Sequence, residues 1–139
     1  MAITYCAERV KVPPFRRREV SSWIRDVAAK YGKKCGDIAY IFCDDEKILE
    51  VNRAYLQHDY YTDVITFDYS EGNVISGDIF ISLDTVRSNA LQYGQPYETE
   101  VYRIIIHGIL HLCGINDKGP GEREKMSACE NEALAMLQK

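Results

Sequence analysis

The most informative stretch of the chain reads His107-Gly-Ile-Leu-His111-Leu-Cys-Gly114-Ile-Asn-Asp117. Residues four apart on a helix share a face, so His107 and His111 project together and can bind one ion. Gly114 can adopt the left-handed conformation that ends a helix and turns the chain back. This turn would deliver Asp117 to the same ion. The sequence therefore predicts a metal site formed by His107, His111 and Asp117.

Three protein ligands leave a fourth position for water, which distinguishes a catalytic zinc from a closed structural one. A bound metal lowers the pKa of that water from about 15.7 to about 7, and hydrolysis follows. We therefore expect one Zn²⁺ per chain, with another divalent metal as the alternative. The competing interpretation is that the two histidines are only packed or hydrogen-bonded. Cys113 lies between the ligands, but we expect it to pack rather than to bind the metal.

The spacing H-x-x-x-H-x-x-G-x-x-[HD] is that of the metzincin metalloproteases. Those enzymes require Glu directly after the first histidine as general base. Here that position is Gly108, and glycine cannot accept a proton. The peptidase interpretation stays open as an alternative that lacks its main catalytic group.

The patterns on either side of this segment predict the rest of the fold. We expect strands at Ile38–Cys43, Val64–Tyr69 and Val74–Ser82, the last two around a turn at 70–73. Before the histidines we expect a helix from Val20 to Tyr31 ending at Gly32, a helix capped by Asp44 or Asp45 that runs to about Leu56, and a helix Asp84–Tyr93. The histidine-bearing helix should have Pro96 as its first residue, and a last helix should start at about Gly121. The stripe Met126, Cys129, Ala133 and Met136 on the last helix indicates core packing. The prediction is one α+β domain over residues 1–139, with a small mixed sheet of about four strands, about five helices and a metzincin-like metal helix.

The composition is that of a globular protein, with 46% hydrophobic and 27% charged residues among 139. The first residues lack the features of a signal peptide, and no stretch has the roughly 18 apolar residues of a membrane span. We expect a cytoplasmic protein with no membrane partner. Five cysteines lie far apart without a CxxC pair, so we expect reduced, mostly buried thiols.

The charge is unevenly distributed along the chain. The net charge is −4, but residues 1–40 hold nine Lys or Arg against four acids, a balance of +5 that leaves −9 for the remainder. Either the N-terminal region presents a phosphate-binding side, or its cations form a solvated helix face with long side chains over apolar surface.

The histidine segment resembles the HGxLHLxGxxH signature of the YbeY family, the bacterial endoribonucleases of ribosomal RNA maturation. The resemblance extends upstream in the same order. Asn52-Arg-Ala-Tyr55, Asp59, Thr62-Asp63-Val64-Ile65-Thr66-Phe67 and Gly77-Asp78-Ile79 are similar to that family's NxxYRxxDxxTDVLSF and GDI segments. The similarity covers roughly residues 45–132.

Two positions depart from the family pattern. The third metal ligand of the family is usually His, whereas this chain has Asp117, a carboxylate that can also bind zinc. The added negative charge weakens the Lewis acidity of the ion and widens its choice towards Mn or Fe. The arginine that follows Tyr in the family, thought to serve RNA cleavage, aligns with Leu56. Arg53 and His58 are the candidates for binding substrate in its place.

The resemblance implies a single-strand-specific, metal-dependent endoribonuclease in which metal-bound water hydrolyses an RNA phosphodiester. Its partners would be ribosomal RNA and the small ribosomal subunit, in maturation of the 16S 3′ end and in ribosome quality control; the oligomeric state stays undetermined. Thr62 and Asp63 are catalytic candidates, although such a pair before a strand is also a turn or cap device.

Two further carboxylates, Asp78 and Glu100, have possible structural roles. Asp78 is expected to be an edge or structural carboxylate. Glu100 lies two turns before His107 and either orients an imidazole or faces solvent. The loss of arginine at Leu56 keeps open a ribosome-assembly factor that is stabilised by its metal and does not cleave RNA.

Overall fold

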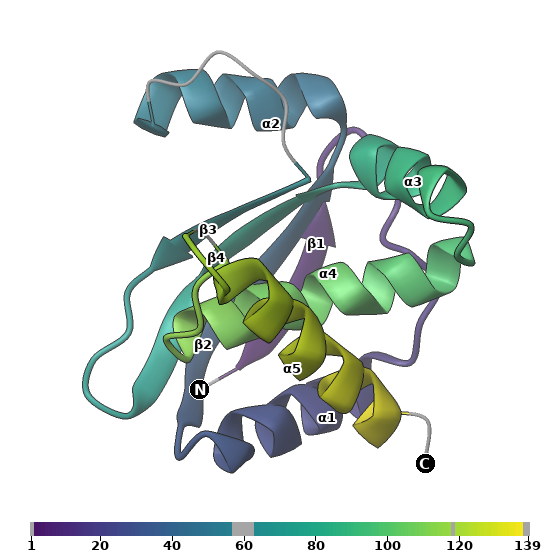
Figure 1. The fold of residues 1–139 in the computed structure, drawn as a ribbon. Coiled ribbons are helices and arrows are strands. Elements are labelled where there is room, and N and C mark those ends of the chain that lie inside the picture. Colours follow the sequence, from purple (N-terminus) through teal and green to yellow (C-terminus); the bar gives the residue numbers. More distant parts are fainter. Residues whose placement is uncertain (1, 57–62, 118, 138–139) are drawn as a thin grey trace.

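The computed structural model describes residues 2–56, 63–117 and 119–137, which contain four strands and five α-helices (Figure 1). The strands are β1 (Ile3–Ala7), β2 (Lys34–Cys43), β3 (Val64–Asp68) and β4 (Val74–Ser82). The helices are α1 (Arg17–Lys30), α2 (Asp45–Val51), α3 (Leu83–Gln92), α4 (Tyr97–Leu112) and α5 (Glu122–Leu137), and a π-helical turn, Asn52–Leu56, extends α2. These elements confirm the predicted α+β class.

The strands form one mixed sheet in the order β1-β2-β4-β3. β1, β2 and β4 are parallel, and β3 is antiparallel to β4. Side chains alternate between the two faces of a strand, and in β4 the residues Ile75, Ile79 and Ile81 are buried on one face while Asp78 and Phe80 point to the other. This alternation directs the main core to one side of the sheet.

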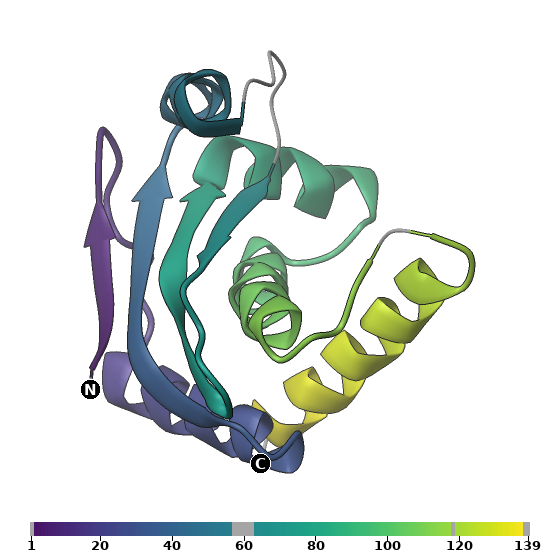
Figure 2. The ribbon, with the colours of Figure 1, turned by 90° about the vertical axis from the view of Figure 1, so that its left-hand side faces the viewer.

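Two hydrophobic cores lie on opposite faces of the sheet. Figure 2 shows α4 and α5 together on one side of it. The larger core joins the inward residues of β2 and β4 to α1 and α4, and α5 packs over α4 from outside. The smaller core lies at one end of the other face, where Ile48 and Val51 of α2 meet Cys43 and Ile65. The long central helix α4 is thus held between the sheet and α5, which fixes the position of its histidines.

The structure also corrects several predicted boundaries. β1 was not expected, because a five-residue edge strand gives little periodicity to read, and β2 begins at Lys34 rather than Ile38. α3 begins at Leu83 rather than at Asp84, because Ser82 is its N-cap and accepts from the Thr85 amide. Pro96 is the N-cap of α4 and not its first helical residue. Asp44 caps α2, since its carboxylate accepts from the Lys47 amide at 2.8 Å.

The described residues bear on the expected absence of a membrane span and on the expected state of the cysteines. None of their helices is both long and apolar enough to cross a membrane. All five cysteines are free, as expected. The expectation that they are mostly buried is wrong in degree: Cys43 is buried, Cys35, Cys113 and Cys129 are half-buried, and Cys6 is exposed on the edge strand β1.

Candidate functional site

The C-terminal end of α4 is a Schellman motif, as its glycine predicts. Gly114 has a φ of +97°. Its amide donates to the His111 carbonyl at 3.0 Å, and the Ile115 amide donates to the Leu110 carbonyl at 3.0 Å. A side chain at position 114 would strain this backbone, so glycine is the residue that lets the chain reverse directly after the histidines.

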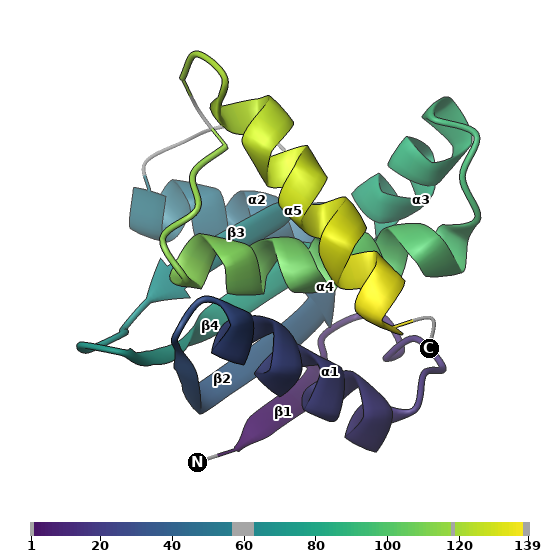
Figure 3. The same cartoon turned by 60° about the horizontal axis from the view of Figure 1, so that its bottom comes forward.

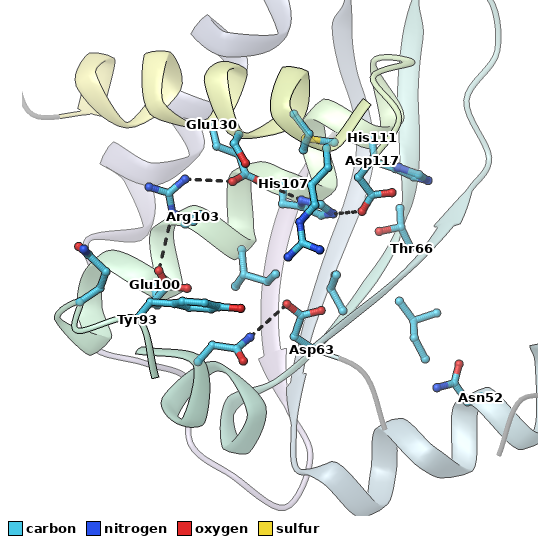
Figure 4. Close-up of a pocket in the computed structure, with 18 residues that line it drawn as sticks. Asn52, Asp63, Thr66, Tyr93, Glu100, Arg103, His107, His111, Asp117 and Glu130 are labelled. Carbon is cyan, nitrogen blue, oxygen red and sulfur yellow. Dashed lines mark hydrogen bonds and ion pairs between the residues drawn. The ribbon is translucent and has the colours of Figure 1, made fainter. Parts of the chain in front are cut away.

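The reversal brings Asp117 back to the first histidine, as predicted. Oδ2 of Asp117 lies 3.3 Å from Nε2 of His107 (Figure 4). Two ligand atoms that lie about 2.0–2.1 Å from one tetrahedral zinc are about 3.3–3.4 Å apart. The spacing of these two atoms is therefore that of neighbouring ligands on one ion.

Glu130 of α5 binds the other nitrogen of the same imidazole. Its Oε2 lies 2.7 Å from Nδ1 of His107, and its side chain is 9% exposed. The second oxygen, Oε1, accepts from Arg103 at 3.0 Å, and the Arg103 guanidinium lies 3.7 Å from Glu100 (Figure 4). With Nδ1 donating to Glu130, Nε2 of His107 presents its lone pair towards Asp117, as in carboxylate–histidine–zinc arrangements.

The surrounding carboxylates also govern the protonation of His107. Burial lowers the pKa of its imidazole, but the hydrogen bond and charge of Glu130, together with the charges of Asp117 and Asp63, outweigh burial and raise that pKa above its ordinary value. The site is thus strongly attractive to positive charge at Nε2. A proton and a divalent ion would compete for this position.

His111 lines the same pocket but is not grouped with the other two predicted ligands. Its ring is nearly parallel to that of His107, with centroids 6.5 Å apart. Its Nδ1 is buried and lacks a hydrogen-bond partner among the described residues, a cost of about 1–3 kcal/mol. Across the part of the chain that the structure describes, no three His, Cys, Asp or Glu side chains are grouped closely enough to hold an ion. A three-ligand site thus requires the His111 ring to turn about its side-chain bonds.

Gly108 faces the sheet rather than the pocket. A Cβ at this position would lie 2.9 Å from Cδ1 and 3.1 Å from Cγ2 of Ile79, which is completely buried in β4. Glycine here allows α4 to approach the sheet closely. A glutamate at this position would be directed into the core, so this chain lacks both the base of a metzincin and the space for one.

The pocket around the histidines has a volume of about 800 Å³, within the range of ligand-binding cavities. It is walled by β3, α3, α4, α5 and the π-helical turn. Its polar lining comprises Asn52, Asp63, Thr66, Asn89, Tyr93, Gln95, Glu100, Arg103, His107, His111, Asp117, Arg123, Ser127 and Glu130. Four carboxylates and two arginines therefore surround one cavity, which suits a cation and a negatively charged substrate together.

Asp63, a predicted catalytic candidate, lines this pocket at the start of β3. Burial raises the pKa of its carboxyl, against the opposing charge of His107. Asn89 of α3 donates to its Oδ2 at 3.5 Å, and its own carbonyl accepts from the Ser82 amide at 2.9 Å. The carbonyl bond extends the pairing of β3 with β4 by one residue. The carboxylate also accepts from the backbone amides of Asp63 and Val64, which supports the turn or cap interpretation, while its position in the pocket is what the catalytic interpretation requires.

The other predicted site residues are placed less favourably. Thr62 and His58 lie outside the described residues. Arg53 is exposed on the π-helical turn and does not line the pocket. The backbone of Leu56 ends the same turn. π-Helical turns are often found beside functional sites, and here the turn places buried Asn52 in the pocket wall.

Three further expectations concern residues near the histidines. Asp78 points to the sheet face away from the main core and accepts from the Tyr69 hydroxyl at 3.3 Å, as a structural carboxylate would. The side chain of Glu100 is 12% exposed and pairs with Arg103, so the expectation that Glu100 faces solvent is wrong. The carboxylate that contacts an imidazole is that of Glu130. Cys113 packs against the main core, and burial raises the pKa of its thiol to about 11.

Glu130 and Arg103 are the site residues that the sequence interpretation missed. Met126, Glu130 and Ala133 share one buried stripe of α5, and the stripe was expected to serve packing alone. A carboxylate within an apolar stripe was the signal available, because a buried charge needs a partner. Arg103 lies one helical turn before His107, so its position on the ligand face was also readable.

Comparison with known proteins bears on the whole chain. The sequence matches the family model described as Endoribonuclease YbeY over residues 3–138. A protein of this name from Phocaeicola vulgatus is 70% identical over 135 residues, which cover 97% of this chain and 98% of the relative. Another from Bacteroides thetaiotaomicron is 68% identical over 136 residues, covering 98% and 99%.

The fold is similar to the solution structure of TM1509 from Thermotoga maritima. The TM-score is 0.62 at 23% identity, with 99% of this chain and 92% of that chain covered. At this identity the likeness concerns the fold alone. The family match, however, includes the histidine helix, the returning loop and the α5 carboxylate within one continuous span. The resemblance carried by His107–Asp117 is therefore confirmed, and the chain belongs to the Endoribonuclease YbeY family.

Proposed function

We propose that this protein is a cytoplasmic, metal-dependent endoribonuclease that cuts single-stranded segments of ribosomal RNA. The reaction belongs to maturation of the 16S 3′ end and to ribosome quality control, with the small subunit as partner. Support comes from the names of the relatives and from a pocket that combines ligand-type side chains with arginines. The 3.3 Å spacing of His107 Nε2 and Asp117 Oδ2 is the observation that carries the metal assignment.

The ligands of the proposed Zn²⁺ are His107, Asp117 and, after rotation of its ring, His111. A divalent ion held there would polarise a phosphoryl oxygen and make water more acidic. Glu130 fixes the tautomer and the orientation of His107, and Arg103 holds Glu130 in turn.

We assign the binding of the substrate phosphate to Arg123. Two arginines line the described part of the pocket, and Arg103 is occupied by Glu100, Glu130 and Asn131. Arg123 is exposed at the mouth of the pocket and forms no ion pair with a described residue. A planar guanidinium can bind two phosphate oxygens at once. Arg123 would thus supply from α5 the cation that the family arginine supplies at the position of Leu56.

Asp63 is the proposed proton acceptor for the attacking water. It lies in the pocket, and burial raises the pKa of its carboxyl towards the range useful for proton exchange. Asn89 orients the carboxyl through the 3.5 Å contact. Asp63→Asn should consequently lower the cleavage rate more than it changes RNA binding.

Cleavage of small-subunit RNA and of whole ribosomes tests the proposal. The parent should cut in a metal-dependent manner, whereas the parent with chelator and the His107→Ala variant should not, and casein should stay intact. Glu124→Ala, an exposed substitution on α5, serves as the control that retains cleavage. Cleavage that survives both chelator and His107→Ala would come from a contaminating nuclease.

A non-catalytic assembly factor is the second candidate, favoured by Leu56 at the arginine position. It would bind ribosomes and metal without cutting RNA under any metal condition. The absence of cleavage by the metal-loaded parent, in RNA and in ribosomes, would therefore favour this second function.

A further inference from the structure

A second feature lies on α1, outside the pocket. Side chains of this helix fall into three sectors, because successive residues are rotated by about 100°. One sector is the core face, with Val20, Trp23, Ile24, Val27 and Ala28 buried. The next sector holds Arg17, Arg18, Ser21 and Arg25, which recur at spacings of three and four residues, while Glu19 and Asp26 lie on the opposite side. The cations are thus separated from the anions of the same helix.

α1 and the edge strand β1 lie side by side (Figure 3). The basic sector and β1 form the two walls of a groove, here called the α1 groove. The residues that line it are Ile3, Thr4, Tyr5, Arg17, Arg18, Ser21 and Arg25. The hydroxyls of Tyr5 and Ser21 are hydrogen-bonded at 2.9 Å within the groove. One of the two hydroxyl protons is used in this bond, so the pair leaves one O–H that can donate to an anion beside the guanidinium groups.

The arginines of the groove are free of carboxylates among the described residues. No ion pair joins Arg17, Arg18 or Arg25 to any described acid, in contrast to the cations at the N-cap and in the last turn of α1. Arg16 pairs with Glu19 at 3.2 Å, and Lys30 pairs with Glu132 at 2.6 Å. The positive charge of the groove is therefore not neutralised within the described protein.

Two of the guanidinium groups also lie near the groove phenol. Burial raises the pKa of Tyr5, and its hydrogen bond to Ser21 and the charges of Arg25 and Arg17 oppose that rise. The two arginines lie about two turns apart on α1, roughly 12 Å along the helix axis, with Ser21 between them on the same stripe. Their positions favour a ligand with repeated negative groups over a single small anion.

We propose that the α1 groove binds phosphate groups of single-stranded RNA outside the cleavage pocket. Arginine forks match phosphate oxygens in pairs, and the neighbouring hydroxyls can bind the same groups. β1 and β3 are the two edges of the sheet, so the groove and the β3 side of the pocket are separated by three strand spacings, about 14 Å. One RNA strand bound at both places would therefore span several nucleotides. The proposal takes its RNA substrate from the proposed function, but it does not depend on cleavage.

A double substitution with a charge-matched control tests the groove. Arg17→Ala/Arg25→Ala removes two unpaired cations of α1, and Arg16→Ala/Lys30→Ala removes two paired cations of the same helix. Binding of a small-subunit RNA strand of about 30 nucleotides is measured by fluorescence anisotropy between about 50 and 200 mM salt. The groove variant should lose more than about tenfold in affinity. The slope of log binding constant against log salt concentration should become shallower by about 1.4, as expected when two phosphate contacts on a single strand are lost. The control should bind like the parent.

Further measurements separate this proposal from the pocket and from folding. Zinc affinity, measured by competition with a chromogenic chelator, reports on the pocket and should be equal in the parent and the groove variant. Thermal unfolding checks that both double variants are folded, and Arg18→Ala against Arg16→Ala repeats the comparison if the groove variant is not.

Two outcomes would overturn the proposal. The first is equal binding of the long RNA by the groove variant and its control. The second is displacement of the long RNA by polyglutamate as readily as by an RNA of equal charge, which would assign the groove to an acidic protein. If the parent cleaves no RNA but the long strand still binds through the groove, the proposed function fails while this inference stands.

Discussion

Glu130 on α5 holds Nδ1 of His107 on α4 at 2.7 Å, although 23 residues separate the two in the chain. The contact fixes which imidazole nitrogen faces the pocket. It also joins α5 to α4, so the packing of α5 and the orientation of the proposed ligand depend on each other.

We therefore expect Glu130→Gln to weaken metal binding by about 10–100-fold, the usual effect of losing the carboxylate partner of a histidine ligand. The substitution preserves size but removes the charge that orients and polarises His107. Zinc affinity is measured by competition with a chromogenic chelator. Glu124→Gln, at an exposed position on the same helix, should leave affinity unchanged. Equal affinity in the two variants would show that Glu130 supports packing only.

Asp117 should behave as a ligand that histidine can replace. Asp117→His should keep about one metal ion per chain, and Asp117→Ala should lose it, because imidazole and carboxylate both donate to zinc whereas a methyl group cannot. Stoichiometry is read by native mass spectrometry, with His111→Ala as a second loss-of-ligand variant. Full metal content in Asp117→Ala would make another group, Cys113 first, the third ligand.

Arg123→Ala should raise the KM for RNA by about tenfold or more while changing kcat less, since a charge-assisted contact to phosphate contributes about 1.5–3 kcal/mol. Arg123→Lys should recover part of the loss, because it keeps the charge but not the fork. Lys125→Ala removes an exposed cation two residues away that does not line the pocket, and serves as the control. A matching rise in KM for Lys125→Ala would indicate a general effect of charge.

Gly108→Glu should destabilise the protein by at least about 2 kcal/mol without creating a peptidase, because the new side chain would enter the core against Ile79. The comparison is Thr99→Glu, near the start of the same helix, where the side chain is half-exposed. Thermal unfolding and casein hydrolysis are the readouts. A folded Gly108→Glu variant that hydrolyses casein would refute this description of position 108.

Cys43 should resist alkylation in the native protein. Burial, followed by the charges of Asp44 and Glu8, raises the pKa of its thiol to about 12, so at pH 8 only about one thiol in ten thousand is ionised. Cys6 on the exposed edge strand should react first with iodoacetamide, as followed by peptide mass spectrometry. Labelling of native Cys43 as fast as Cys6 would contradict its burial.

The sequence by itself determined the features that depend on residues close along the chain. Helix periodicity placed α1, α3, α4 and α5 approximately, and alternation located β3 and β4. The pair His107 and His111 with Gly114 predicted a helix, its end and the return of Asp117, because all of these are set within a few turns of backbone. The family followed from the same local motifs.

The tertiary structure alone decided the contacts between distant segments. β1 exists because β2 supplies the hydrogen bonds that a five-residue strand cannot supply for itself. Glu130 reaches His107 only because α5 packs across α4, and Gly108 is required only because Ile79 lies beneath it. Arg17, Arg18 and Arg25 border a groove only because β1 runs beside α1. Each of these contacts joins residues that are far apart in the chain and come together only after folding. The spacing of residues within one helix or strand does not indicate which other element will pack against it.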